Sequence, residues 1–284
     1  MNLTSGIGKL TRWLQSLSPN KPIGISTLSR KLYRLLPRYQ GVIELEDGLN
    51  MHLDTNIPPE RGIFFAGDRH RVLTAVMQQY VKQGAYCMDI GANIGFYTLK
   101  LAQLVGSSGR IAAFEANPTL VTRIRENISL NNFNHINLVN KAVNHMGETA
   151  TFYITANSEL SSLEYRDNAV EKITVHATTI DEFMEESNWE RLDFIKLDIE
   201  GHDCHALIGA NRTLRNFRPY IVLEYHYHSD TVIAAEAFEI LKEIGYTIEG
   251  IILRSGKRLP FDWQHPHTKD AHHINLLCRL MTTR

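Results

Sequence analysis

The sequence is poor in cysteine and has no long hydrophobic run. Its 284 residues include three cysteines, Cys87, Cys204 and Cys278. They lie far apart and form no Cys-x-x-Cys pair, which argues against a disulfide framework or a cysteine-based zinc site and favours buried thiols in a reducing compartment. No apolar run approaches the roughly 18 residues that cross a membrane, and no secretory signal precedes the first polar residues. We therefore expect a cytoplasmic protein.

Acidic residues are absent from the first 40 positions, which carry seven lysine and arginine residues. The rest of the chain holds 23 basic groups (30 less those seven) against 31 acidic ones, a net charge of −8. Such an acidic body argues against a nucleic-acid partner. The basic leader, residues 1–40, has two interpretations. It contacts the anionic inner face of a membrane weakly, or it forms short helices that pack on the domain or on a second copy in a homodimer; we favour packing.

Apolar strands alternate with helical patterns from residue 85 onward. This alternation predicts a mostly parallel sheet with helices on both faces. The predicted strands are 85–90, 110–115, 136–143, 149–155, 172–177, 192–199, 220–225, 246–253 and 273–280. The predicted helices are 71–82, 96–105, 118–131, 179–187, 204–214 and 231–244. Before them, residues 41–53 alternate around Asp47-Gly48, which is typical of a β-hairpin.

A glycine turn follows the first strand of this series. The strand 85–90 contains Asp89 next to its end, and Gly91 and Gly95 lead into a helical pattern. In α/β proteins a strand, an acid, a glycine turn and a helix bring a nucleotide-like ligand to the C-terminal end of the strand. Glu115 ends the next strand, twenty residues beyond Gly95. An acid at that distance is placed to bind ribose hydroxyls.

The turn lacks two glycines that a dinucleotide site needs. Asn93 and Phe96 occupy those positions, so the backbone cannot approach a pyrophosphate closely. Asp89 would repel a diphosphate but suits a cation. A ligand that combines a ribose with an ammonium and a sulfonium group is S-adenosylmethionine, with Asp89 toward the methionine end and Glu115 at the ribose. The predicted cofactor-binding residues are Asp89, Gly91, Asn93, Gly95, Glu115 and, through its backbone at the adenine edge, Ala142.

Acidic residues also stand at the ends of the fourth and fifth strands of the predicted sheet. Asp198 and Glu200 close the fourth, and Glu224 and His226 share a face of the fifth. Buried carboxylates are costly unless they bind something, so Asp198, Glu200 and His226 are the predicted catalytic residues, acting as general base or holding a cation. Helix capping is the alternative for Glu200. The four residues match a metal site in ligand type, but their spacing does not demand one, and no metal is predicted.

Five motifs taken together resemble the FkbM family of S-adenosylmethionine-dependent methyltransferases. They are Asp89-Ile-Gly-Ala-Asn-Ile-Gly-Phe-Tyr-Thr98, Ala113-Phe-Glu-Ala-Asn-Pro118, Glu126-Asn-Ile-Ser-Leu-Asn-Asn132, Phe194-Ile-Lys-Leu-Asp-Ile-Glu-Gly201 and Leu207-Ile-Gly-Ala210. The resemblance covers roughly residues 85–250. It implies the class I methyltransferase fold, a Rossmann-like α/β sheet of seven mostly parallel strands with a reversed last strand. It also implies O-methylation of a hydroxyl on a sugar, a glycan or a polyketide-like small molecule.

Two details refine this resemblance. Ser161-Ser162-Leu163 is similar to a Ser-Leu element in the family's mid-domain loop, and we expect it to lie on the substrate side. Ala116 stands where the family more often has proline, a departure that leaves Glu115 untouched.

On this basis the chain divides into three parts. These are a basic helical extension at 1–40, a hairpin and helix at 41–82, and a methyltransferase domain at 83–284. Three alternatives stay open: a non-catalytic S-adenosylmethionine-binding scaffold, a methyltransferase with a protein or lipid-linked acceptor, and a nicotinamide-dependent oxidoreductase, against which the missing glycines argue.

Overall fold

The computed structural model describes residues 38–67, 71–155, 161–226, 230–252, 257–261 and 273–280. The chain divides into two compact units, Met1–Thr74 and Ala75–Arg284. The basic leader, residues 1–40, is predicted to be helical. Its residues 1–37 lie outside the described residues. Among the helices that the structure describes, none is long and apolar enough to cross a membrane.

The first unit contains the predicted hairpin and a helix that the sequence analysis missed. Strands β1 (Gln40–Glu44) and β2 (Asn50–Asp54) pair in antiparallel register, and the turn between them uses Gly48 in a left-handed conformation, with φ 82°. Helix α3 (Pro58–Ala66) follows. This helix begins with two prolines. Proline breaks the interior of a helix but is tolerated in the first turn, where an N–H group would have no helical partner. Glu60 ties α3 to β2 by accepting a hydrogen bond from the Asp54 N–H at 2.7 Å.

The second unit is built on an eight-stranded sheet. Its strand order is β12-β11-β13-β10-β9-β3-β4-β5. The strands are β3 (Tyr86–Ile90), β4 (Arg110–Phe114), β5 (Ile136–Val139), β9 (Phe194–Leu197), β10 (Tyr220–His226), β11 (Tyr246–Ile252), β12 (Lys257–Pro260) and β13 (His273–Leu280). The run from β10 to β5 is parallel, whereas β13 is antiparallel to both neighbours. This confirms the predicted sheet and its reversed last strand; β12 is an additional edge strand.

Helices cover both faces of this sheet, as alternate residues of β4 demonstrate. Ala112 and Phe114 belong to one buried cluster, which α7, α8, α9 and α10 complete. Ala113 belongs to another, in which Ile124 of α6 packs against it. Side chains alternate between the faces of a strand, so the two clusters lie on opposite sides. The helices of this unit are α4 (Arg71–Tyr80, which begins in the first unit), α5 (Phe96–Val105), α6 (Pro118–Leu130), α7 (Ile180–Ser187), α8 (Asp203–Ile208), α9 (Asn211–Phe217) and α10 (Thr231–Ile244).

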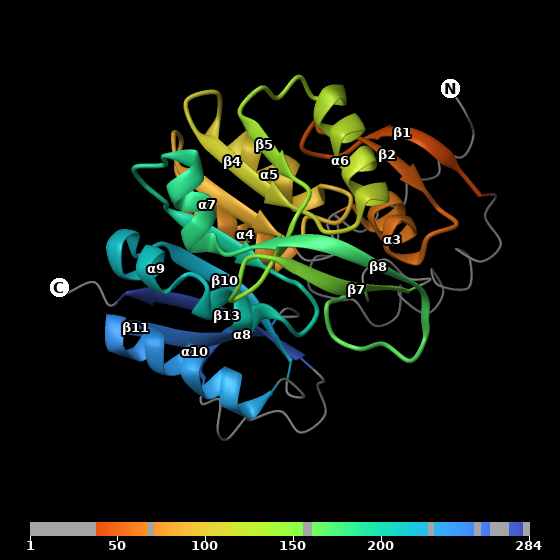
Figure 1. The fold of residues 1–284 in the computed structure, drawn as a ribbon. Helices are drawn as coiled ribbons and strands as arrows, with labels where there is room; N and C mark the ends of the chain where they lie inside the picture. The colour runs from red at the N-terminus through yellow and green to blue at the C-terminus, as the bar shows by residue number, and fades with distance from the viewer. Residues whose placement is uncertain are drawn as a thin grey trace. The chain divides into compact units, whose positions relative to one another are not determined.

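Two predicted elements are divided in the structure. The strand predicted at 136–143 becomes β5 and β6 (Ala142–Val143), and β6 joins β7 (Thr149–Thr155) and β8 (Ala169–Thr178) in a separate sheet of order β6-β8-β7 (Figure 1). The helix predicted at 204–214 becomes α8 and α9, with Gly209 as the C-cap of α8. A Cβ on Gly209 would lie 2.3 Å from the Asn144 carbonyl oxygen. The absence of a side chain at this position therefore lets the end of α8 approach that backbone closely.

Candidate functional site

The turn between β3 and α5 depends on left-handed backbone conformations. Gly91 has φ 81° and Gly95, the N-cap of α5, has φ 86°. A Cβ on Gly91 would lie 1.9 Å from the carbonyl oxygen of Asp198, so a larger residue does not fit there. Asn93 is also left-handed, with φ 53°, a conformation that asparagine tolerates better than most residues. The turn therefore brings bare backbone to the C-terminal edge of the sheet.

Glu115 follows β4 and bonds back to this turn. Its Oε2 accepts a hydrogen bond from the Asn93 N–H at 2.8 Å, and its Oε1 accepts one from the Asn117 N–H at 2.9 Å. The residue is 7% exposed. Burial raises the pKa of Glu115 to about 7, although the two backbone hydrogen bonds act in the opposite direction. Each carboxylate oxygen keeps a second lone pair, so Glu115 lies beside the turn with capacity for a hydroxyl.

Asp89 is fully buried and is bound by side chains of its own domain. The Thr98 hydroxyl donates to its Oδ2 at 2.6 Å, and the Lys196 Nζ lies 3.3 Å from its Oδ1. Lys196 also donates to the Gly91 carbonyl oxygen at 3.1 Å and lies 3.6 Å from Asp198 Oδ2. The cation next to Asp89 in the structure is therefore the Lys196 ammonium.

The sequence analysis missed Lys196. Burial alone would lower the pKa of its ammonium, but the carboxylates of Asp89 and Asp198 outweigh burial and raise that pKa. A signal was available: a single lysine stands inside an otherwise apolar strand, two residues before Asp198. Its cross-strand partner in the β3–β9 register is Asp89.

Ala142, the predicted adenine-side residue, lies in β6 rather than at the end of a main-sheet strand. It is buried and packs with Ala116 in a small apolar cluster. Asn140 joins the same segment to the end of β4, since its Nδ2 donates to the carbonyl oxygens of Glu115 and Ala116 at 2.9 and 3.1 Å. These hydrogen bonds hold the segment after β5 against the end of β4.

Two of the predicted catalytic residues, Asp198 and Glu200, follow β9, and the third, His226, is the last residue of β10. His226 Nε2 lies 3.2 Å from Glu224 Oε2 and 4.0 Å from Glu200 Oε2. Glu200, Glu224 and His226 each offer a possible ligand atom, and these atoms lie within 4.8 Å of one another. The Asp198 side chain remains 35% exposed. Three of the four residues of the metal alternative thus come close together, whereas Asp198 is not part of this group.

The carboxylates of this region raise one another's pKa. Burial first, and then the Asp198 charge, raise the pKa of Glu200 to about 8. The same two causes raise the pKa of Asp203 to about 7. Burial also raises the pKa of Asp198, and the Lys196 ammonium opposes that rise. Burial lowers the pKa of His226, but the hydrogen bond to Glu224 and the surrounding acids outweigh it, so the net shift is upward.

Glu200 does not cap the helix that follows β9. The N-cap of α8 is His202, and Asp203 closes the turn by accepting from the N–H groups of Ile199 and Gly201 at 3.3 and 3.2 Å. Glu200 instead has a left-handed φ of 55°. Strained conformations of this kind cluster at functional sites.

The loop between β7 and β8 is fastened to this turn. The Ser162 hydroxyl and the Arg166 guanidinium each donate to the Glu200 carbonyl oxygen at 2.9 Å. The Ser161 hydroxyl instead accepts a hydrogen bond from the N–H of Thr155, the last residue of β7, at 3.0 Å. The Ser-Leu element therefore holds the loop against the acidic turn, and its serines are both buried.

A family model described as the methyltransferase FkbM domain matches residues 89–248. No curated protein matches the chain. Similar solved structures include the methyltransferase FkbM from Methylobacillus flagellatus KT, with 16% identity, 76% of this chain and 52% of that chain covered, and a TM-score of 0.44. An rRNA methylase from Streptococcus thermophilus has 10% identity and a TM-score of 0.46, and the match covers 76% of this chain and 98% of that chain. Aeropyrum pernix fibrillarin, in complex with S-adenosyl-L-methionine, has 14% identity and a TM-score of 0.41, and the match covers 86% of this chain and 96% of that chain.

Proposed function

Because the chain belongs to the FkbM methyltransferase family, we propose that it methylates a hydroxyl group of a sugar, a glycan or a polyketide-like small molecule. The protein is a methyltransferase that depends on S-adenosylmethionine. One observation carries the proposal: the partly exposed carboxylate of Asp198 shares the Lys196 ammonium with the Gly91 carbonyl of the glycine turn, and Gly91 leaves no room for a Cβ against the Asp198 backbone. A base for a hydroxyl and a cradle for a cofactor therefore share one strand edge.

The residues at this edge fit S-adenosylmethionine. Gly91 and Gly95 open the turn, and the Asn93 N–H fixes Glu115 beside it, where its carboxylate accepts hydrogen bonds from the ribose hydroxyls. Asp89 acts indirectly, because it holds Lys196, and Lys196 holds the Gly91 carbonyl. Ala142 lines the adenine side. The bound cofactor supplies a methyl group on a positively charged sulfur.

Asp198 then takes the proton of the acceptor hydroxyl. Its raised pKa makes it a better base than an exposed aspartate. Glu200, whose pKa is about 8, is mostly protonated at neutral pH and donates a hydrogen bond to the acceptor. His226, bound to Glu224, is the second candidate base. Alignment of the acceptor oxygen with the methyl group supplies most of the rate.

The acceptor class is tested with a radiolabelled methyl group. Purified enzyme and labelled S-adenosylmethionine are incubated with fractionated cell extract, separated into small molecules, glycans, lipid-linked material, protein and RNA. We expect label in the small-molecule or glycan fraction, bound through oxygen. Label confined to protein, to lipid-linked material or to RNA would refute the proposed acceptor, and cofactor binding without any transfer would favour the scaffold alternative.

The role of Asp198 is tested on the labelled fraction. Asp198→Asn should keep its affinity for S-adenosylhomocysteine in calorimetry and lose about 10²- to 10⁴-fold in turnover, the usual contribution of a positioned base. Glu239→Gln, an exposed acid on α10, is the matched control. Unchanged turnover in Asp198→Asn would remove this residue from the mechanism and leave His226 as the base.

We also propose a cytoplasmic location, with residues 1–40 as a basic extension that packs on the methyltransferase domain or a second copy. Vesicle co-sedimentation compares the full chain with a variant that lacks residues 1–40. Equal partition onto anionic vesicles would exclude the membrane alternative, whereas loss of binding in the shortened chain would favour it over packing.

A further inference from the structure

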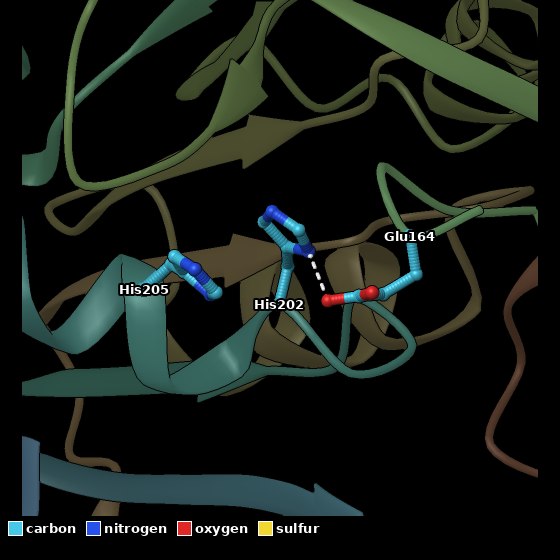
Figure 2. Close-up of side chains that lie close together, drawn as sticks. All are labelled: Glu164, His202 and His205. Atoms are coloured by element: carbon cyan, nitrogen blue, oxygen red, sulfur yellow. Dashed lines mark ion pairs between the residues drawn. The ribbon is translucent and has the colours of Figure 1, made fainter. Parts of the chain in front are cut away.

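A second group of side chains meets near the turn after β9, outside the proposed catalytic residues. It consists of Glu164, from the loop between β7 and β8, His202, the N-cap of α8, and His205, within α8 (Figure 2). We call it the Glu-His-His cluster. One possible ligand atom from each residue lies within 4.8 Å of the others. The Nδ1 of His202 is 3.0 Å from Glu164 Oε1, the contact drawn in Figure 2.

The two histidines are three residues apart at the start of α8, a spacing that places side chains on one face of a helix. Their rings stack, with centroids 4.2 Å apart and planes 12° from parallel. The Nδ1 atom of His205 is buried and makes no hydrogen bond to any part of the chain that the structure describes. A buried nitrogen without a hydrogen-bond partner is costly, and a ligand that accepts its lone pair removes that cost.

We propose that the Glu-His-His cluster binds a divalent transition-metal ion of the zinc class. Two imidazoles and one carboxylate are ligands that Zn²⁺ takes readily, whereas Mg²⁺ and Ca²⁺ prefer sets made of oxygen alone. Three protein ligands leave the fourth tetrahedral position to water or to an oxygen of a bound molecule.

The other group that meets the same distance criterion, Glu200, Glu224 and His226, is less suited to such an ion. Its ligands are the carboxylates of Glu200 and Glu224 and a single imidazole, that of His226. Carboxylate-rich sets suit Mg²⁺, Ca²⁺ and Mn²⁺ better than Zn²⁺. Only one nitrogen ligand is present there, against two in the Glu-His-His cluster.

An ion in the Glu-His-His cluster would join two segments that border the proposed acceptor site. Glu164 follows Ser162 in the loop after β7, and its N–H donates to the Ser162 hydroxyl at 3.1 Å. His202 lies two residues after Glu200 in the turn that follows β9. The Ser162 hydroxyl donates to the Glu200 carbonyl oxygen of this turn. The ion would add to the contacts that Ser162, Arg166 and Glu164 already make across this boundary. The metal site goes beyond the proposed methyl transfer, and its test does not depend on that transfer.

The test is metal binding by the full chain. Protein treated with a chelator and dialysed is titrated with Zn²⁺ against a chromophoric competitor, and with Co²⁺ to record its ligand-field spectrum. We expect one tight equivalent and a four- or five-coordinate Co²⁺ spectrum. Glu164→Gln and His205→Ala should each weaken binding by about 100-fold or more, because even residues behind the ligands contribute about 10- to 100-fold. His145→Ala is the matched control, since its ring lies 5.1 Å from His205 but outside the cluster, and it should bind as the parent does.

Three results would overturn the proposal: no stoichiometric Zn²⁺ binding, equal loss in His145→Ala and His205→Ala, or loss in Glu224→Gln with none in His205→Ala. Calorimetry with S-adenosylhomocysteine on every variant reports whether the domain is folded. Glu164→Gln changes a loop side chain that is 43% exposed, so it keeps the test valid if His205→Ala unfolds. A chain that binds S-adenosylhomocysteine but not Zn²⁺ refutes the metal site and leaves the methyltransferase proposal intact.

Discussion

Replacing Lys196 with methionine removes a positive charge from the centre of the main sheet while keeping a side chain of similar length. Lys196 is 3% exposed, and its Nζ lies 3.3 Å from a carboxylate oxygen of Asp89, which is fully buried. At an effective dielectric constant of about 20, that separation corresponds to an attraction of about 5 kcal/mol. Lys196→Met therefore leaves Asp89 as a buried charge that, among the residues the structure describes, keeps a hydrogen bond from the Thr98 hydroxyl.

The expected loss of unfolding free energy is about 3–5 kcal/mol, the usual cost of removing one partner from a buried ion pair. For a unit of this size each 1 kcal/mol corresponds to about 2–4 °C in Tm, so Tm should fall by about 6–20 °C. The double variant Asp89→Asn with Lys196→Met should recover most of this loss, because it removes both charges and keeps an oxygen that accepts from Thr98. Lys141→Met is the control, since Lys141 forms a solvent-accessible ion pair with Glu186 at 3.7 Å, and such surface pairs are worth about 0–1 kcal/mol.

Thermal and urea unfolding of the four proteins measure these differences. A Lys196→Met variant within about 0.5 kcal/mol of the parent, the range of ordinary surface substitutions, would refute the argument. So would a double variant that is no more stable than Lys196→Met alone, because the cost would then not come from the uncompensated Asp89. Calorimetry with S-adenosylhomocysteine adds a functional check: Lys196 also holds the Gly91 carbonyl, so cofactor affinity should fall with it.

Two further predictions concern the cofactor side of the site. Gly91→Ala should cost at least about 2 kcal/mol of unfolding free energy, because it combines left-handed strain with a Cβ 1.9 Å from the Asp198 carbonyl oxygen. Gly95→Ala, at φ 86° but with the nearest atom to its Cβ at 3.3 Å, should cost about 1–2 kcal/mol. Equal losses of the two variants in thermal melts would count against the Asp198 contact. Burial raises the pKa of Glu115 from 4.5 to about 7, so the folded state favours its protonated form, and the resulting stability is present below pH 4.5 and is lost as the pH rises through about 7. Glu115→Gln should accordingly flatten the decline in unfolding free energy over that range in urea titrations, and an unchanged decline would show that other groups cause it.

The sequence predicted the main sheet well because its signals are local. The helices at 96–105 and 231–244 have the predicted bounds in the structure, since a glycine stands at the N-cap or C-cap of each. The small sheet was not foreseen. The chain leaves the main sheet between β5 and β6, where Asn140 bonds the carbonyls of Glu115 and Ala116, and no pattern of apolar residues encodes that long-range contact.

The candidate site was predictable in composition but not in connectivity. Asp89, Glu115 and Asp198 stand at the strand ends where the sequence placed them, because parallel strands deliver their C-terminal ends to one edge. Their partners come from other strands and loops. Lys196 meets Asp89 only through the register of β3 and β9, and Glu164 meets His202 across 38 positions of chain. Such pairings depend on tertiary packing, which a single sequence does not display.

The contact between Gly91 and Asp198 also bears on how this enzyme can diversify. What the turn touches at position 198 is a carbonyl oxygen, an atom that every amino acid carries. Any residue larger than glycine at 91 would therefore collide with this backbone whatever side chain stands at 198. Exchange of the side chain at 198 would act on the turn only indirectly, through Lys196, which lies 3.6 Å from Asp198 Oδ2 and donates to the Gly91 carbonyl. The architecture thus sets a position that is fixed by shape next to one whose role rests on its side-chain chemistry.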